Sequence, residues 1–156
     1  MGELSERNLT DSSMQRERQP VPKMNILAVD DEPNLPIVFG RMAQCSKMAY
    51  AIGLFKVVSS GQEAVREVLE EPGRYNVVLT DLQMPEMDGL RVADALKDQE
   101  GVFVYVVSGA VDSIDQNKLK TEHGVRGFLK KPYSLEEVGN FLNDAYRDLD
   151  IKEGKI

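Results

Sequence analysis

Charged and hydroxyl side chains stand directly after the apolar runs of this sequence, at positions where they could meet. The pair Asp30-Asp31 follows the first run, Asp81 follows the third and Ser108 follows the fourth. The pair Lys130-Lys131 follows the fifth run. A carboxylate at the end of an apolar strand is costly unless it is paired, so Asp81, within the stretch YNVVLTDLQMPEMDGL, requires partners.

Three carboxylates at one edge of a sheet predict a metal site. In open α/β sheets, ligands bind beyond the carboxyl ends of the strands, which is where Asp30, Asp31 and Asp81 would lie. Three such groups repel one another at neutral pH, and a divalent cation offsets that repulsion. Oxygen ligands from a few protein groups suit Mg²⁺, which keeps several of its waters. The sequence therefore favours a Mg²⁺ site with a lysine nearby.

Apolar runs and helical patterns alternate and predict the elements that carry these residues. Strands are expected at Ile26–Val29, Leu54–Val58, Val77–Thr80, Val102–Val107 and Val125–Leu129. Helices are expected at Asn34–Met48, from Ser60 to Leu69, after Asp88, around Ser113–Lys120 and after Ser134. The Ser-x-x-Glu spacing that begins at Ser60 and at Ser134 is that of a capping box, and Asp88 can cap the third helix.

The order of these elements predicts one α/β domain. Most of the strands are continuously apolar rather than alternating, as in a parallel sheet covered by helices on both faces. A chain of 156 residues has room for one ordinary domain. We expect residues 24–150 to form it, with a flexible N-terminal tail over 1–23 and a C-terminal tail over 151–156.

Composition and charge exclude several classes of protein. A formal net charge of -7 argues against a general nucleic-acid-binding surface, which requires a basic face. No apolar run has the length of a membrane span, and the N-terminus lacks the apolar core of a secretory signal. Cys45 is the only cysteine, so an intramolecular disulfide is impossible and a cytoplasmic location is expected. Because Cys45 continues the apolar stripe Leu35, Val38 and Met42, we expect it to pack in the core.

Four segments carry a family resemblance. VDDEP, TDLQMPEMDG, VVSGA and LKKP resemble, in this order, the signature blocks of the response-regulator receiver domain of two-component signalling. The similarity covers about residues 24–148. It implies a flavodoxin-like, doubly wound sheet of five parallel strands in the order 2-1-3-4-5, with five helices.

The resemblance implies a role for each matching acidic residue. Asp81 would accept a phosphoryl group from a phosphohistidine of a partner kinase. Asp31 would bind Mg²⁺, or Mn²⁺ in its place, directly, and Asp30 would bind it mainly through water. Asp81 and the backbone carbonyl of Gln83 would complete the protein's share of the metal ligands.

Other matching positions concern the phosphoryl group and the response to it. Ser108, where threonine is more usual, would hydrogen-bond one phosphoryl oxygen, and Lys131 would pair with another. Phe128 stands where the family carries the aromatic residue whose rotamer reports phosphorylation, and Pro132 would follow a cis peptide bond. Movement of Ser108 and Phe128 would change the surface formed by the fourth helix, the fifth strand and the fifth helix.

The implied function is a signalling switch and not an enzyme, since the domain would assist only its own phosphorylation and dephosphorylation. The expected partners are a sensor histidine kinase or phosphotransfer protein, and a downstream protein target that binds the switched surface. Direct binding to nucleic acid or membranes is not expected, and a homodimer formed on phosphorylation remains open. The alternatives are a phosphorylation-independent interaction module with this fold, or the receiver part of a longer regulator.

Simpler roles remain for several of these residues. The Asp30-Asp31 pair could merely cap the helix that follows it. Neighbouring strand residues point to opposite faces, so one of Lys130 and Lys131 can reach the site, and the resemblance selects Lys131. Phe128 could be a plain core aromatic. His123, which precedes a glycine, is expected in a surface turn.

Overall fold

The structure is a computed structural model that describes the backbone of residues 23–152 and the side chains of residues 23–149. Residues 1–22 of the predicted N-terminal tail and residues 153–156 of the predicted C-terminal tail lie outside the described residues. The last helix extends to Lys152, so the first two residues of the predicted C-terminal tail are helical.

Five parallel strands form the sheet, as predicted. They are β1 (Met24–Val29), β2 (Ile52–Val58), β3 (Val77–Asp81), β4 (Phe103–Ser108) and β5 (Val125–Lys130). Their order is β2-β1-β3-β4-β5, which confirms the order implied by the resemblance. The order reverses direction between β1 and β3, and this switch point is where α/β sheets bind their ligands.

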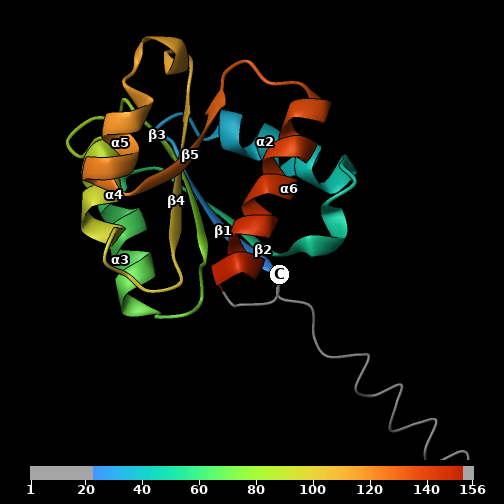
Figure 1. The fold of residues 1–156 in the computed structure, drawn as a ribbon, viewed down its shortest axis with the longest axis horizontal. Helices are drawn as coiled ribbons and strands as arrows, with labels where there is room; N and C mark the ends of the chain where they lie inside the picture. The colour runs from blue at the N-terminus through green and yellow to red at the C-terminus, as the bar shows by residue number, and fades with distance from the viewer. Residues whose placement is uncertain (1–22, 153–156) are drawn as a thin grey trace, which may run out of the picture.

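Helices cover both faces of the sheet (Figure 1). The first layer contains α2 (Asn34–Cys45) and α6 (Leu135–Lys152), and the second contains α3 (Gly61–Glu70), α4 (Gly89–Leu96) and α5 (Gln116–His123). Short 3-10 helices lie at Ala49–Ala51 and Val111–Ser113. Within the described part of the chain, every helix is too short or too polar to cross a membrane.

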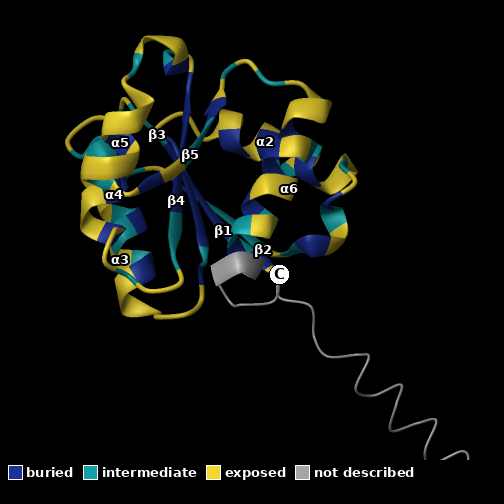
Figure 2. Cartoon of the chain, in the orientation of Figure 1, coloured by how far each residue is buried: buried dark blue, intermediate teal, exposed yellow. Residues whose placement is uncertain are grey.

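The core consists of two apolar layers, one on each face of the sheet. Successive residues of β1 alternate between them: Ile26 and Ala28 belong to the layer under α2 and α6, and Leu27 and Val29 to the layer under α3, α4 and α5. All four side chains are buried, which explains the continuously apolar sequence of this strand (Figure 2).

The predicted helix caps are confirmed. The hydroxyl of Ser60 accepts a hydrogen bond from the amide of Glu63, and that of Ser134 accepts one from Glu137. The carboxylate of Asp88 accepts a hydrogen bond from the amide of Arg91 and so begins α4. The fourth helix was predicted too early. It begins at Gln116 because Asp115 caps it, accepting from the amide of Lys118.

The predicted buried stripe of α2 is wrong. Leu35 and Val38 are 38% and 44% exposed, and Cys45 is exposed as well. The helix instead buries Pro36, Phe39 and Ala43, because the ring of Phe39 packs among three aromatic rings of the core. The sequence offers two apolar stripes on this helix, one with Cys45 and one with Phe39. Burying the aromatic ring of Phe39 stabilises the fold more than burying a cysteine does. Cys45 therefore does not pack in the core.

The end of α2 also differs from the prediction, which extended the helix to Met48. The hydroxyl of Ser46 donates to the carbonyl of Ala43 and accepts from the amide of Met48. Serine in this position offers the backbone an alternative to helical hydrogen bonds, and the helix ends at Cys45.

Candidate functional site

The first two acidic residues follow β1 and differ in burial. Asp30 is 4% exposed, and its carboxylate accepts a hydrogen bond of 2.8 Å from the amide of Glu32. Asp31 is exposed. Helix α2 has Pro33 at its N-cap position and receives no hydrogen bond there from a capping side chain. The simpler role of these aspartates as helix caps is therefore not supported.

Asp81 is the last residue of β3, next to β1 in the sheet. Its carboxylate accepts a long hydrogen bond of 3.4 Å from the amide of Gln83, which is exposed. The following loop turns back closely, since the amide of Gly89 donates to the carbonyl of Leu82. A Cβ atom on Gly89 would lie 2.2 Å from the carbonyl oxygen of Asp81, so only glycine permits this approach.

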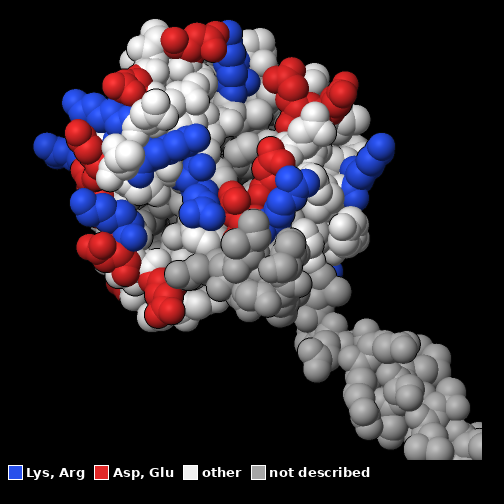
Figure 3. Space-filling view, in the orientation of Figure 1, with Lys and Arg blue, Asp and Glu red and all other residues white. Residues whose placement is uncertain are grey.

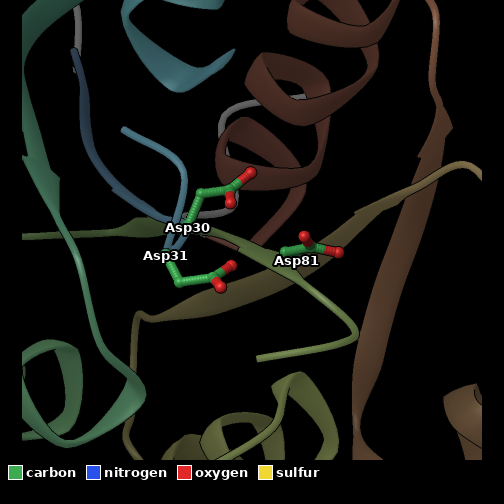
Figure 4. Close-up of side chains that lie close together, drawn as sticks. All are labelled: Asp30, Asp31 and Asp81. Carbon is green, nitrogen blue, oxygen red and sulfur yellow. The ribbon is translucent and has the colours of Figure 1, made fainter. Parts of the chain in front are cut away.

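The three aspartates form one cluster. One carboxylate oxygen from each of Asp30, Asp31 and Asp81 lies within 4.8 Å of the others. In Figure 4 the side chains come from the ends of the adjacent strands β1 and β3 and lie side by side. The cluster grades from the buried Asp30 through the half-buried Asp81 to the exposed Asp31. A cation could thus be held on protein oxygens while its outer side remains hydrated.

Lys131 supplies positive charge to this cluster. Its Nζ atom lies 3.0 Å from Oδ2 of Asp30 and 3.3 Å from Oδ2 of Asp81, and the side chain is 19% exposed. Burial acts to lower the pKa of this ammonium, but the hydrogen bond that it donates to Asp30 and the charges of both aspartates outweigh burial, so the pKa is raised. Lys131 therefore stays charged at neutral pH.

Lys130 points elsewhere and forms an ion pair with Asp112. The structure thus brings Lys131, and not Lys130, to the carboxylates, in agreement with the alternation of side chains along a strand. The bond between Lys131 and Pro132 is cis, as the resemblance implied.

Ser108 and Phe128 lie on the neighbouring strands β4 and β5. Ser108 ends β4 and is buried, and its hydroxyl accepts a hydrogen bond of 3.1 Å from the amide of Ala110. Its carbonyl accepts from the amide of Lys131 at 3.0 Å. Phe128 is half-buried on β5 opposite Val106, and Nζ of Lys120 lies 5.9 Å from its ring centre. Phe128 is therefore not a fully buried core aromatic.

Sequence analysis missed Tyr133, which lies just past the cis bond. Its hydroxyl donates a hydrogen bond of 3.2 Å to the carbonyl of Leu35, and its ring packs edge-on against Phe39 at 5.8 Å. Tyr133 lines a small cavity of about 20 Å³ together with Asp81 and Lys131. Burial raises the pKa of its hydroxyl. In the sequence, only its place two positions after Lys131 could have indicated that Tyr133 lies near the site.

His123 was predicted in a surface turn, and this prediction is wrong in part. The residue ends α5 and is half-buried, and its Nδ1 atom lies 2.7 Å from Oδ1 of Asp94 on α4. Gly124, with φ of 68°, ends the helix in the left-handed conformation that glycine adopts without strain. The histidine thus joins two helices away from the acidic cluster.

Comparison with known proteins identifies the fold and the family. The chain matches the family model of the response regulator receiver domain over residues 26–143. The transcriptional regulatory protein GlrR of Escherichia coli (strain K12) is 31% identical over 122 residues, which cover 78% of this chain and 26% of GlrR. The two-component response regulator ORR26 of Oryza sativa subsp. japonica is 27% identical over 126 residues, which cover 80% of this chain and 20% of ORR26. The chain thus spans well under a third of the length of these curated relatives.

Solved structures with low sequence identity share the fold. The chemotaxis protein CheY4 of Vibrio cholerae superposes with a TM-score of 0.65 at 20% identity, covering 79% of this chain and 98% of CheY4. The signal receiver domain of a putative Luxo repressor protein from Vibrio parahaemolyticus gives a TM-score of 0.69 at 16% identity, covering 84% and 95%. The family match over residues 26–143, together with the strand order, shows that this chain belongs to the receiver domain family of two-component response regulators.

Proposed function

We propose that this domain is a phosphorylation-dependent switch in which Asp81 accepts a phosphoryl group from a phosphohistidine. One observation carries the proposal: the carboxylate of Asp81 lies 3.3 Å from the ammonium of Lys131 and shares a rim with two further carboxylates. A cluster of three carboxylates, of which Asp30 is buried and Asp81 half-buried, paired with Lys131 serves no evident packing purpose. It does suit the charge neutralisation that phosphoryl transfer requires.

The three carboxylates fit a magnesium ion. Their oxygens are hard ligands, and their mutual separation of at most 4.8 Å is compatible with one shared cation. Asp31 and Asp81 would bind the ion directly, Asp30 mainly through water, and the backbone carbonyl of Gln83 would add a further ligand. When bound, Mg²⁺, or Mn²⁺ in its place, supplies positive charge to the oxygens of the phosphoryl group.

The transfer itself would use the protein's own groups. An oxygen of the Asp81 carboxylate attacks phosphorus, the phosphorus–nitrogen bond of the donor breaks, and its electron pair remains on the imidazole. An acyl phosphate forms on Asp81. Lys131 would then exchange its contact with the Asp81 carboxylate for one with a phosphoryl oxygen, and the hydroxyl of Ser108 would donate to another.

The response would follow from the movement of Ser108. Its hydroxyl oxygen accepts from the amide of Ala110 in the β4–α5 loop, so a movement of Ser108 toward the phosphoryl group would carry this loop with it. Phe128, half-buried on the adjacent strand, could then turn inward. The surface formed by α5, β5 and α6 would change, and a downstream protein would bind one form better. Figure 3 shows this face with basic and acidic side chains interspersed, as suits a protein partner.

The donor would be a sensor histidine kinase or a phosphotransfer protein, in the cytoplasm. Four exposed apolar side chains lie on the first part of α2 and at the start of α6: Leu35, Ile37, Val38 and Leu135. Leu35 lines the same small cavity as Asp81, so this apolar surface borders the acidic rim. It could bind the apolar face of a donor helix while a histidine reaches Asp81. The domain would assist its own phosphorylation without acting as an enzyme on other substrates.

The test is phosphorylation by a small acyl-phosphate donor in the presence of Mg²⁺, followed by intact mass spectrometry. We expect the wild-type protein to gain one phosphate and the Asp81→Asn variant to gain none. Asp88→Asn is the matched control, because Asp88 is a nearby aspartate that caps α4, and this variant should be labelled like the wild type. If Asp81→Asn is labelled as strongly as wild type, Asp81 is not the acceptor. If a cognate phosphodonor protein also fails to label the wild type, the proposal is wrong.

A further inference from the structure

A second contact, besides the ion pairs of Lys131, joins the β5–α6 loop to the start of α2. Tyr133 lies two residues after Lys131, in the β5–α6 loop, and its hydroxyl donates to the carbonyl of Leu35 at 3.2 Å. Leu35 belongs to the first turn of α2, directly after the loop that carries Asp30 and Asp31. Residues separated by 98 positions in the sequence are thereby linked at the edge of the site.

This second contact differs from the first in the partners that it uses. Lys131 bonds to Asp30 and Asp81, both of which would acquire new partners when metal and phosphoryl groups bind. The hydroxyl of Tyr133 bonds to a backbone carbonyl outside that cluster. The Tyr133 contact can therefore persist while the ammonium of Lys131 exchanges one oxygen for another.

The ring of Tyr133 is held as well as its hydroxyl. It packs edge-on against Phe39, with a distance of 5.8 Å between ring centres and an interplanar angle of 85°. Phe39 is buried in the core beneath α2. The ring also lines the small cavity shared by Asp30, Asp81 and Lys131. Packing fixes the ring, and the hydroxyl fixes how far the loop stands from α2.

We propose that Tyr133 is a positioning residue for phosphorylation: its hydroxyl holds the β5–α6 loop against α2, so that Lys131 reaches the phosphoryl group on Asp81. The inference rests on the proposed function. A purely structural role would be that of a core aromatic whose hydroxyl adds only to stability. The two roles differ in what the loss of the hydroxyl alone should change.

The test compares Tyr133→Phe with Tyr75→Phe. Each substitution keeps the ring and removes one hydroxyl, and the hydroxyl of Tyr75 bonds to Glu67 at 3.3 Å, among residues that do not line the site. For each variant and the wild type, the rate of labelling by a small acyl-phosphate donor is measured at saturating Mg²⁺. Mg²⁺ affinity and thermal stability are measured in parallel.

We expect Tyr133→Phe to slow labelling roughly two- to tenfold, the range that corresponds to the loss of one neutral hydrogen bond. Its Mg²⁺ affinity should match that of the wild type, because the three carboxylates are untouched. Tyr75→Phe should be labelled at the wild-type rate, even if its melting temperature falls as much as that of Tyr133→Phe. Equal rates for Tyr133→Phe and wild type would overturn the inference, as would a matching slowdown in Tyr75→Phe or a parallel loss of Mg²⁺ affinity. Failure of the wild type to be labelled at all would instead refute the proposed function.

Discussion

The ammonium of Lys131 lies 3.3 Å from the carboxylate of Asp81, although 50 residues separate them in the sequence. The same ammonium lies 3.0 Å from the buried Asp30, so one positive charge is shared by two carboxylates. Burial alone would favour a neutral lysine, but these two acidic neighbours raise its pKa. Lys131 thus keeps its full positive charge beside the carboxylate of Asp81, the proposed acceptor.

Replacement of Lys131 by alanine should slow phosphorylation of Asp81 by roughly 10- to 100-fold, the value of a charge-assisted hydrogen bond. Lys130→Ala is the matched control, because Lys130 is the adjacent lysine and pairs with the exposed Asp112. Its labelling rate should stay within about twofold of wild type, since exposed ion pairs contribute little. Rates are measured by intact mass over time at saturating Mg²⁺. Equal slowing in both variants would show that Lys131 has no specific role.

Mg²⁺ should stabilise the folded domain through the acidic cluster. At a free concentration ten times the dissociation constant, one site raises the free energy of unfolding by about 1.4 kcal/mol. Asp31→Asn should lose most of this gain, while its stability without metal should be equal to or above that of wild type because one repelling charge is removed. Glu32→Gln, at the next exposed acidic residue, should keep the full gain. Urea unfolding with and without Mg²⁺ measures both quantities, and a gain that persists in Asp31→Asn would argue against this ligand.

Gly89→Ala should disturb the loop that follows Asp81. The added Cβ would lie 2.2 Å from the carbonyl oxygen of Asp81, so backbone must move. We expect a loss of about 1–3 kcal/mol in unfolding free energy, the usual cost of overpacking, together with slower phosphorylation.

Gly139→Ala provides the comparison for this glycine. Gly139 lies within α6, and an added Cβ would meet only the Cβ of Ser46 at 3.8 Å, an ordinary contact. Alanine in a helix interior is favoured over glycine by about 0.5–1 kcal/mol, so this variant should gain stability and keep its phosphorylation rate. If Gly89→Ala behaved like Gly139→Ala, the close approach at Asp81 would have no energetic consequence.

The raised pKa of Tyr105 predicts that the folded domain loses stability at alkaline pH. Burial, with the charge of Asp148 and the hydrogen bond to it, raises the pKa of this phenol well above its ordinary value of 10.0. Above pH 10 the unfolded chain loses a proton that the folded state retains. The unfolding free energy therefore falls as pH rises, by up to about 1.4 kcal/mol per pH unit from this group.

The measurement is urea unfolding of wild type and Tyr105→Phe between pH 8 and pH 11. At pH 8 the wild type should be more stable by about 1.5–3 kcal/mol, because the phenol donates to a carboxylate. The difference should shrink or reverse by pH 11. A Tyr105→Phe difference that stays constant with pH would contradict the assigned cause.

The strands and the acidic cluster were predictable because their signals are local. Continuously apolar runs ended by charged residues give the strand ends, and the parallel arrangement brings Asp30 and Asp81 to adjacent strand ends. Because side chains alternate along β5, only one of Lys130 and Lys131 can reach the acidic cluster, and the family resemblance indicated Lys131. The order of the strands came from that resemblance and not from the pattern.

Features that depend on long-range packing were not predictable. The ring of Phe39 determines which face of α2 is buried. That face is favoured because Phe39 packs against the rings of Phe55 and Phe141, which are distant in the sequence. The helix has two apolar stripes, and its own sequence does not decide which of them faces the core. The contact of Tyr133 with Leu35 is likewise invisible until the β5–α6 loop meets α2.

The chemical identity of the phosphorylated residue tests the central proposal most directly. The labelled protein is reduced with sodium borohydride, which converts an aspartyl phosphate to homoserine, and the peptides are sequenced by tandem mass spectrometry. We predict homoserine at position 81 and unmodified aspartate at positions 30 and 31. Homoserine at either of those two positions, or labelled protein with aspartate intact at position 81, would contradict the assignment of Asp81 as the phosphoryl acceptor.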